Sequence, residues 1–249
     1  MNLSLYRLCQ YLGIPPRLWM IPNPIKTYEY LRVSEPAKLS PSDKILDLGC
    51  GNAHWTMLLA EQCAYAVGVE PSKQKIHTAR QFIRHSALKD KMEFFATTLQ
   101  EAHLPDSAFD HVFSFCVLEH IPDLHDVLLE VHRILKPGGC FHVSVDSLTT
   151  IENKNLLAKH KTDHSVVQYF TPASLQAQMA VAGFRPSAIY PILKSEFARD
   201  EFSRRIMGGY KRNPYQRMLV RRRFFLEDAQ VESDKGIMIV GHFERTVEK

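Results

Sequence analysis

The chain has 249 residues, of which 45% are hydrophobic and 23% are charged, close to the average of globular proteins. This composition excludes a disordered chain, a collagen and a coiled coil, and the length suits one large domain or one domain with a cap. The net charge of +4 is too small to indicate nucleic-acid binding by itself.

The cysteines and the apolar runs indicate in which cellular compartment the protein is found. The five cysteines are scattered and odd in number, which argues against a disulfide framework and favours a reducing environment. No apolar run approaches the roughly 18 residues that a membrane helix needs, and the N-terminus lacks the basic start and cleavage site of a secretory signal. We therefore expect a cytoplasmic protein.

Residues 1–40 are expected to form a helical lead-in. Apolar residues recur at helical spacing until Pro15 and Pro16 stop the pattern, and a second helix is expected over residues 25–39.

Residues 42–190 alternate short apolar runs with helical patterns, which predicts an α/β domain with a parallel sheet. Strands are expected at residues 44–48, 65–70, 92–97, 109–116 and 140–146. An apolar helix face covers residues 124–135, and Pro137, Gly138 and Gly139 are expected to end that helix.

The remaining elements are less regular. Thr171, Pro172 and Gly183 mark the ends of a further helix. Strands at residues 185–193 and 236–245 are expected to complete the sheet, with a mostly helical insert at residues 194–229 between them. We expect all these parts to form one domain over residues 1–249.

A glycine-rich turn after the first expected strand carries the most specific signal. Gly49 and Gly51 would let a ligand approach the backbone beside a helix N-terminus. Glu70, nineteen positions after Gly51, ends the second strand, where an acidic side chain can accept hydrogen bonds from ribose hydroxyls. These features fit any adenosine-containing cofactor.

Two residues decide between such cofactors. A dinucleotide fingerprint needs Gly or Ala at position 54, where this chain has His54. Asp47, just before the turn, would repel a pyrophosphate but favour a cationic ligand such as an amine or a sulfonium.

Five segments in order resemble the motifs of class I S-adenosylmethionine-dependent methyltransferases. Residues 45–52 are similar to their motif I, and residues 67–70 to their acidic second-strand motif. The fourth-strand region is matched by residues 104–110 and 117–123, and the helix and turn before the fifth strand by residues 129–139. A late helix is matched by residues 169–172 and 182–184. The sequence is most similar to the type-11 small-molecule subgroup, which includes quinone-pathway enzymes.

The resemblance implies a Rossmann-like three-layer sandwich. Its seven-stranded sheet would be mostly parallel with an antiparallel last strand, and S-adenosylmethionine would bind at the carboxyl edge of the strands. Motif by motif, the cofactor-binding residues would be Asp47, Gly49, Cys50, Gly51, Glu70, Pro71, Thr98, Leu99, Cys116 and Val117.

The same resemblance implies a role for each group. Residues 47–51 would lie along the methionine part, Glu70 would hold the ribose, and Cys116 and Val117 would lie beside the transferred methyl group. Thr98 and Leu99 would flank the adenine, although the family usually has Asp where this chain has the uncharged Thr98.

Methyl transfer from a sulfonium needs mainly positioning and exclusion of water, but oxygen acceptors usually also need a base. His120 follows the fourth strand at the catalytic edge and is our candidate catalytic residue. The alternative is a histidine that only fixes the loop through backbone hydrogen bonds. His142 and Asp146 are weaker candidates, for which we expect structural roles.

We expect no metal in the active site. Four residues near the fourth strand could ligate zinc in principle, but a generic loop needs no metal. They are Cys116, Glu119, His120 and His125.

The basic residues gather in one segment. Residues 194–223 hold ten basic and three acidic residues, a net charge of +7 that leaves −3 for the rest of the chain. The segment could be a solvated cap whose aromatic side chains close over the acceptor, or a basic face on an anionic membrane or lipid-like substrate. Nucleic acid is the least favoured partner, because no RNA-binding module accompanies the segment.

The most consistent function is methyl transfer to a small apolar, quinone- or lipid-like acceptor. The N-terminal helix would form one wall of its pocket, with apolar residues Leu5, Leu8, Leu12, Leu18 and Trp19. Two alternatives stay open: a non-catalytic S-adenosylmethionine-binding scaffold or sensor, and an RNA methyltransferase that uses the basic insert.

Overall fold

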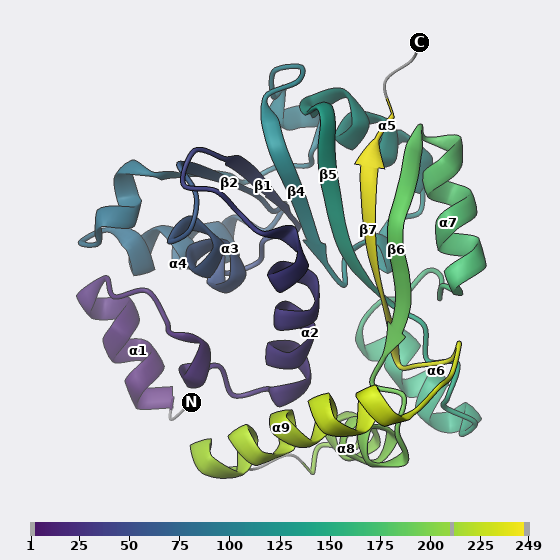
Figure 1. Cartoon of the computed structure of the whole chain (residues 1–249). Helices are drawn as coiled ribbons and strands as arrows, with labels where there is room; N and C mark the ends of the chain where they lie inside the picture. The colour runs from purple at the N-terminus through teal and green to yellow at the C-terminus, as the bar shows by residue number, and fades with distance from the viewer. Residues whose placement is uncertain (1–2, 210–211, 247–249) are drawn as a thin grey trace.

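A seven-stranded sheet forms the centre of the molecule in the computed structural model (Figure 1). The structure describes residues 3–209 and 212–246, with only the backbone for residues 3–6. Along the sheet the strand order is β3-β2-β1-β4-β5-β7-β6. The strands are β1 Lys44–Leu48, β2 Tyr65–Val69, β3 Met92–Phe95, β4 Phe109–Phe115, β5 Leu135–Asp146, β6 Phe184–Ile192 and β7 Met238–Arg245.

Strand directions match the expected topology. The five strands β3, β2, β1, β4 and β5 pair in parallel. β7 is antiparallel to both β5 and β6. The predicted Rossmann-like sheet with an antiparallel last strand is therefore confirmed.

Helices cover both faces of the sheet. Side chains of α2 (Pro24–Ser34), α3 (His54–Ala60) and α4 (Lys73–Ile83) share one core with Ile45, while α5 (Leu124–Ile134) and α7 (Pro172–Val181) share the other with Leu46. Neighbouring residues of β1 thus point to opposite layers, as alternation along a strand requires. This arrangement is the predicted three-layer sandwich.

The first helix packs against one of the helices beside the sheet. α1 (Leu3–Leu12) packs against α4, and Leu8 and Leu12 remain exposed. Leu5 falls among the residues whose side chains lie outside the described part of the chain. The expected long second helix is shorter, because α2 ends at Ser34 and continues as a 3₁₀ turn over Glu35–Ala37.

The fifth strand begins earlier than predicted. α5 ends at Ile134, and β5 starts at Leu135 instead of residue 140. Pro137 disfavours helical backbone at the residue before it, so the chain becomes extended before the glycines are reached. The Pro137–Gly139 segment is accommodated as an irregularity, where the register between β4 and β5 shifts.

The distal segments form three helices near the carboxyl edge of the parallel strands (Figure 1). They are α6 (Lys154–Asp163), which the sequence analysis did not predict, α8 (Glu196–Ile206) and α9 (Pro214–Gln230). The basic insert is thus two helices, although Tyr210 and Lys211 between them lie outside the described residues. Within the described part of the chain, no helix is both long and apolar enough to cross a membrane.

A buried carboxylate fastens α9 to the rest of the molecule. Asp228 Oδ2 accepts hydrogen bonds from the Tyr28 hydroxyl at 2.8 Å and from Leu193 N at 2.6 Å, while Oδ1 accepts one from Lys194 N at 2.8 Å. The Tyr28 ring also packs on Phe224 and Phe225 of α9. One side chain therefore joins α2, the end of β6 and α9.

Replacing Asp228 with Ala should leave three donors without an acceptor and lower the free energy of unfolding by about 3 kcal/mol. Tyr28→Phe removes one of these bonds and should cost about 1 kcal/mol. Urea denaturation measures both, with exposed Asp234→Ala as the control. A loss of stability in Asp228→Ala no larger than in the control would contradict this role of Asp228.

Candidate active site

The turn after β1 needs glycine at two positions. Gly49 and Gly51 have φ angles of 72° and 57°, in the left-handed region that favours glycine. A Cβ atom on Gly49 would also lie 2.5 Å from Cγ2 of Val117, so no larger residue fits there. The amides of Gly49 and Cys50 both donate to Val69 O, at 2.8 and 3.1 Å, which holds the turn against the end of β2.

Glu70 reaches the turn from the end of β2. Its Oε2 accepts a hydrogen bond from Gly51 N at 3.2 Å, and its Oε1 accepts one from Ser72 N at 3.1 Å. Lys75 Nζ lies 3.3 Å from the same Oε1. The structure thus brings Glu70 and the glycine-rich turn together, with the exposed Pro71 beside them.

Asp47 is a buried carboxyl at the base of the turn. It is 1% exposed, and its Oδ2 accepts a hydrogen bond from Thr56 Oγ1 at 2.5 Å. Burial raises the pKa of Asp47 to about 7, the Thr56 hydrogen bond opposes this, and the charge of Glu70 adds to it. A carboxyl with such a pKa ionises readily when a cation binds next to it.

A cavity of about 220 Å³ opens beside Cys116, at the carboxyl ends of β4 and β5. Helices α2, α6 and α8 supply much of its wall. Its apolar lining comprises Ile25, Phe115, Phe202, Ile206 and Met238. The N-terminal part of the wall therefore comes from the start of α2, whereas we expected it from the first helix.

Three histidines line this cavity. His120 was predicted at this edge, and its Nδ1 lies 3.4 Å from Ser165 O, so it also touches the loop backbone. His160 and His164 come from the unpredicted α6 and its C-terminal end. Burial lowers the pKa of both, although Asp146 opposes this. Neutral imidazoles near pH 7 can accept a proton.

Comparison with known proteins identifies the domain. A family model described as a methyltransferase domain matches residues 46–143. These residues form a class I methyltransferase domain of the type-11 kind. The methyl donor of this domain family is S-adenosylmethionine.

Relatives with known names agree with the domain assignment. A sterol 4-C-methyltransferase of Caenorhabditis elegans is 26% identical over 176 residues, 71% of this chain and 53% of that protein. A demethylmenaquinone methyltransferase of Listeria welshimeri is 30% identical over 41% of this chain and 44% of its own length. The chain thus spans about half the length of these curated relatives.

A solved structure supports the fold alone. Geranyl diphosphate C-methyltransferase from Streptomyces coelicolor superposes with a TM-score of 0.66 at 13% identity. The alignment covers 88% of this chain and 78% of that one.

The methyltransferase domain places an acidic residue beside Thr98 that the sequence analysis missed. Thr98 Oγ1 donates to Glu101 Oε2 at 2.9 Å, and Thr97 Oγ1 donates to the same oxygen at 2.5 Å. The charge that Thr98 lacks is therefore present three residues later. The Thr-x-x-Glu spacing on a tight turn could have revealed it. Leu99, next to Thr98, is buried.

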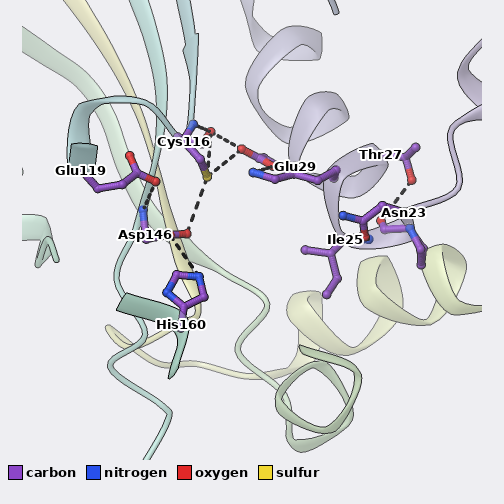
Figure 2. A network of polar contacts seen from close by, with 11 residues as sticks. Asn23, Ile25, Thr27, Glu29, Cys116, Glu119, Asp146 and His160 are labelled. Carbon is purple, nitrogen blue, oxygen red and sulfur yellow. Dashed lines mark hydrogen bonds and ion pairs between the residues drawn. The ribbon is translucent and has the colours of Figure 1, made fainter. Parts of the chain in front are cut away.

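Behind the cavity lies a network of buried polar groups (Figure 2). Glu29 Oε1 accepts hydrogen bonds from Ser144 Oγ at 2.5 Å and from Cys116 Sγ at 3.0 Å. Lys26 Nζ lies 2.8 Å from the other oxygen of Glu29. Sequence analysis missed Glu29, because nothing in its local pattern shows that α2 buries it against β4 and β5.

The same network contains Glu119 and Asp146. Asp146 N donates to Glu119 Oε1 at 3.3 Å, and Asp146 Oδ2 lies 3.5 Å from His160 Nε2. Burial, reinforced by the charge of Asp146, raises the pKa of Glu119 well above its ordinary value. Burial also raises the pKa of the Cys116 thiol. Cys116 is thus a packed thiol, not a reactive thiolate.

The candidate zinc residues do not all converge. Potential ligand atoms of Cys116, Glu119 and Asp146 lie within 4.8 Å of one another, but His120 and His125 are not in this group. His125 is exposed on α5. Of the two weaker catalytic candidates, Asp146 lines the cavity, whereas His142 lies within the sheet.

Asp47 makes stability depend on pH. Its pKa is near 7 in the folded chain and near 3.9 in the unfolded chain, so the unfolded chain loses the proton first. The free energy of unfolding should therefore fall as the pH rises from about 4 to about 7, by up to about 4 kcal/mol from this group.

Asp47→Asn keeps an acceptor for Thr56 and should remove most of that dependence. Urea denaturation of the cofactor-free chain at several pH values measures the difference between variant and wild type. Exposed Asp90→Asn is the control. Parallel pH profiles for Asp47→Asn and wild type would show that Asp47 ionises normally.

Proposed function

We propose that the chain transfers a methyl group from S-adenosylmethionine to a small apolar, quinone- or lipid-like acceptor. The observation that carries this proposal is the cavity beside Cys116, at the edge where the glycine-rich turn ends. The aromatic and aliphatic part of its lining suits the apolar body of an acceptor, and the histidine, lysine and arginine side chains beside it can bind a polar group of the same molecule. The relatives named for sterol and demethylmenaquinone support the same class of acceptor.

In this proposal the cofactor lies across the turn. Residues 47–51 hold the methionine part, and Asp47 faces a positive charge of the cofactor, its amine or its sulfonium. Glu70 holds the ribose, with Pro71 beside it, and the adenine lies against Thr98 and Leu99, with Glu101 next to them. Cys116 and Val117 border the methyl group, so the cavity beyond Cys116 receives the acceptor.

When bound, S-adenosylmethionine supplies an activated methyl group, and the chain positions the acceptor and excludes water. The proposed base for a hydroxyl acceptor is His120. His160, paired with Asp146, lies on the same cavity and is the second candidate. Whichever histidine takes the proton must lie within hydrogen-bond reach of the acceptor oxygen.

The outer face of α9 supports a peripheral contact with anionic lipid. Tyr215, Leu219 and Leu226 recur along one side of this helix and are exposed, with the exposed Arg222 among them. Exposed apolar side chains flanked by arginine suit a negatively charged bilayer surface. The contact would bring an acceptor from the membrane close to α8, which lines the cavity.

Glu70→Ala should weaken S-adenosylmethionine binding by about 1.5–3 kcal/mol, or roughly 10- to 150-fold, because a charged acceptor is lost. Glu70→Gln should fall between this variant and wild type. Calorimetric titration measures the affinities, with exposed Glu93→Gln as the control. An unchanged affinity in Glu70→Ala would refute the ribose assignment.

The function itself is tested by a screen with S-adenosylmethionine carrying a labelled methyl group. Sterols, quinols and prenyl lipids are presented in neutral and in anionic vesicles, with RNA as a separate acceptor. We expect label in an apolar acceptor, with a higher rate in anionic vesicles. Labelling of RNA alone would overturn the proposal.

With the acceptor found, His120→Ala should lower turnover about 10²- to 10⁴-fold for a hydroxyl acceptor while cofactor affinity is retained. Exposed His125→Ala is the matched control. Equal turnover in His120→Ala and wild type would remove His120 as the base.

A further inference from the structure

Three histidines form a continuous row across the sheet, outside the active site. His111 of β4, His142 of β5 and His242 of β7 lie on neighbouring strands, and His142 is directly opposite His242. His111 Nδ1 lies 2.9 Å from His142 Nε2, and His142 Nδ1 lies 2.8 Å from His242 Nδ1. None of the roles proposed above uses this row.

The groups at one end of the row determine which imidazole nitrogens carry a proton. Tyr190 donates its hydroxyl proton to Arg32 O at 3.0 Å, so it offers only its oxygen to His242 Nε2, which lies 3.4 Å away. His242 must therefore donate from Nε2 and accept at Nδ1, because a neutral imidazole has one N–H and one bare nitrogen. His142 then donates from Nδ1 and presents a bare Nε2 to His111.

The other end of the row requires the opposite arrangement. His111 Nε2 lies 3.4 Å from Asp43 Oδ2 and must donate to that carboxylate. A neutral His111 then presents a bare Nδ1 to the bare Nε2 of His142. Two lone pairs face each other at 2.9 Å, so one positive charge between these nitrogens is needed to satisfy the whole row.

A third donor converges on the same point. Cys140 is opposite His111 in the pairing of β4 with β5, and ligand atoms of His111, Cys140 and His142 lie within 4.8 Å of one another. Tetrahedral zinc with these ligands needs separations of about 3.3–3.6 Å, so the two histidine nitrogens would move apart from 2.9 Å to hold the ion. A shared proton would not need the sulfur, whereas a metal ion would use it.

The surroundings also match those of metal ligands. Ligating histidines usually donate their second N–H to a carboxylate or another acceptor, which fixes the ring. Asp43 provides this contact for His111, and His242 provides it for His142. His111 and Cys140 are only partly buried, so an ion can enter.

We propose that His111, Cys140 and His142 form a binding site for a zinc-like divalent cation between the amino end of β4 and the middle of β5. Zinc has the preference for imidazole and thiolate that this donor set requires. The ion would tie β4 to β5 next to the Pro137–Gly139 irregularity, away from the cofactor edge. This inference does not depend on the proposed methyl transfer.

Cobalt titration of the untagged, metal-free chain tests the site, because a cobalt–thiolate bond gives a charge-transfer band in the near ultraviolet. We expect one equivalent to bind with this band in the wild type. Cys140→Ser should lose the band and His111→Gln should weaken binding at least tenfold. The controls Cys63→Ala and His77→Gln should behave like the wild type.

Zinc competition against the cobalt-loaded protein tests the outer contacts. Asp43→Asn should bind zinc about 10- to 100-fold more weakly, because it no longer orients His111 as a carboxylate does. Circular dichroism verifies that each variant is folded. If His111→Gln does not fold, Cys140→Ser, a substitution at a partly exposed position, provides the test. Absence of saturable binding, or binding that Cys140→Ser leaves unchanged, would overturn the proposal.

Discussion

β1 and β4 are neighbours in the sheet although β2 and β3 come between them in the chain. The connections after these two strands therefore leave in opposite directions, and a crevice opens where they part. The turn at Gly49 and the segment at Val117 face each other there, so closely that Gly49 can carry no Cβ. This constraint brings the turn close to the segment that leads to the cavity beside Cys116.

Buried acidic side chains lie on both sides of this crevice. Asp47 lies on the turn side, whereas Asp146 lines the cavity and Glu29 and Glu119 are buried next to it. Burial raises the pKa of Asp47 and of Glu119, and Lys26 is a nearby cation on the cavity side. A site with this excess of carboxyl groups is suited to a positively charged ligand such as a sulfonium.

Local sequence patterns predicted the strands that carry the turn. The buried run before Gly49 and the acidic end at Glu70 are local signals, bounded by residues that break strands. The early start of β5 was predicted wrongly, because Pro137 acts on the helix before it while the two glycines still permit an extended chain.

Features that depend on distant pairing could not be predicted in this way. Glu29 sits in a helix whose burial is decided by β4 and β5, and α6 lacks a strong apolar pattern that would reveal His160. The histidine row joins positions 31 and 100 residues apart, which only the strand order brings together.

The most direct test of the account is calorimetric titration of S-adenosylmethionine into the chain near pH 7, in two buffers with different ionisation enthalpies. We predict one site per chain and release of a fraction of a proton, because the cation drives Asp47 to ionise. Saturable binding without proton release would contradict the role of Asp47, and absence of binding would contradict the account as a whole.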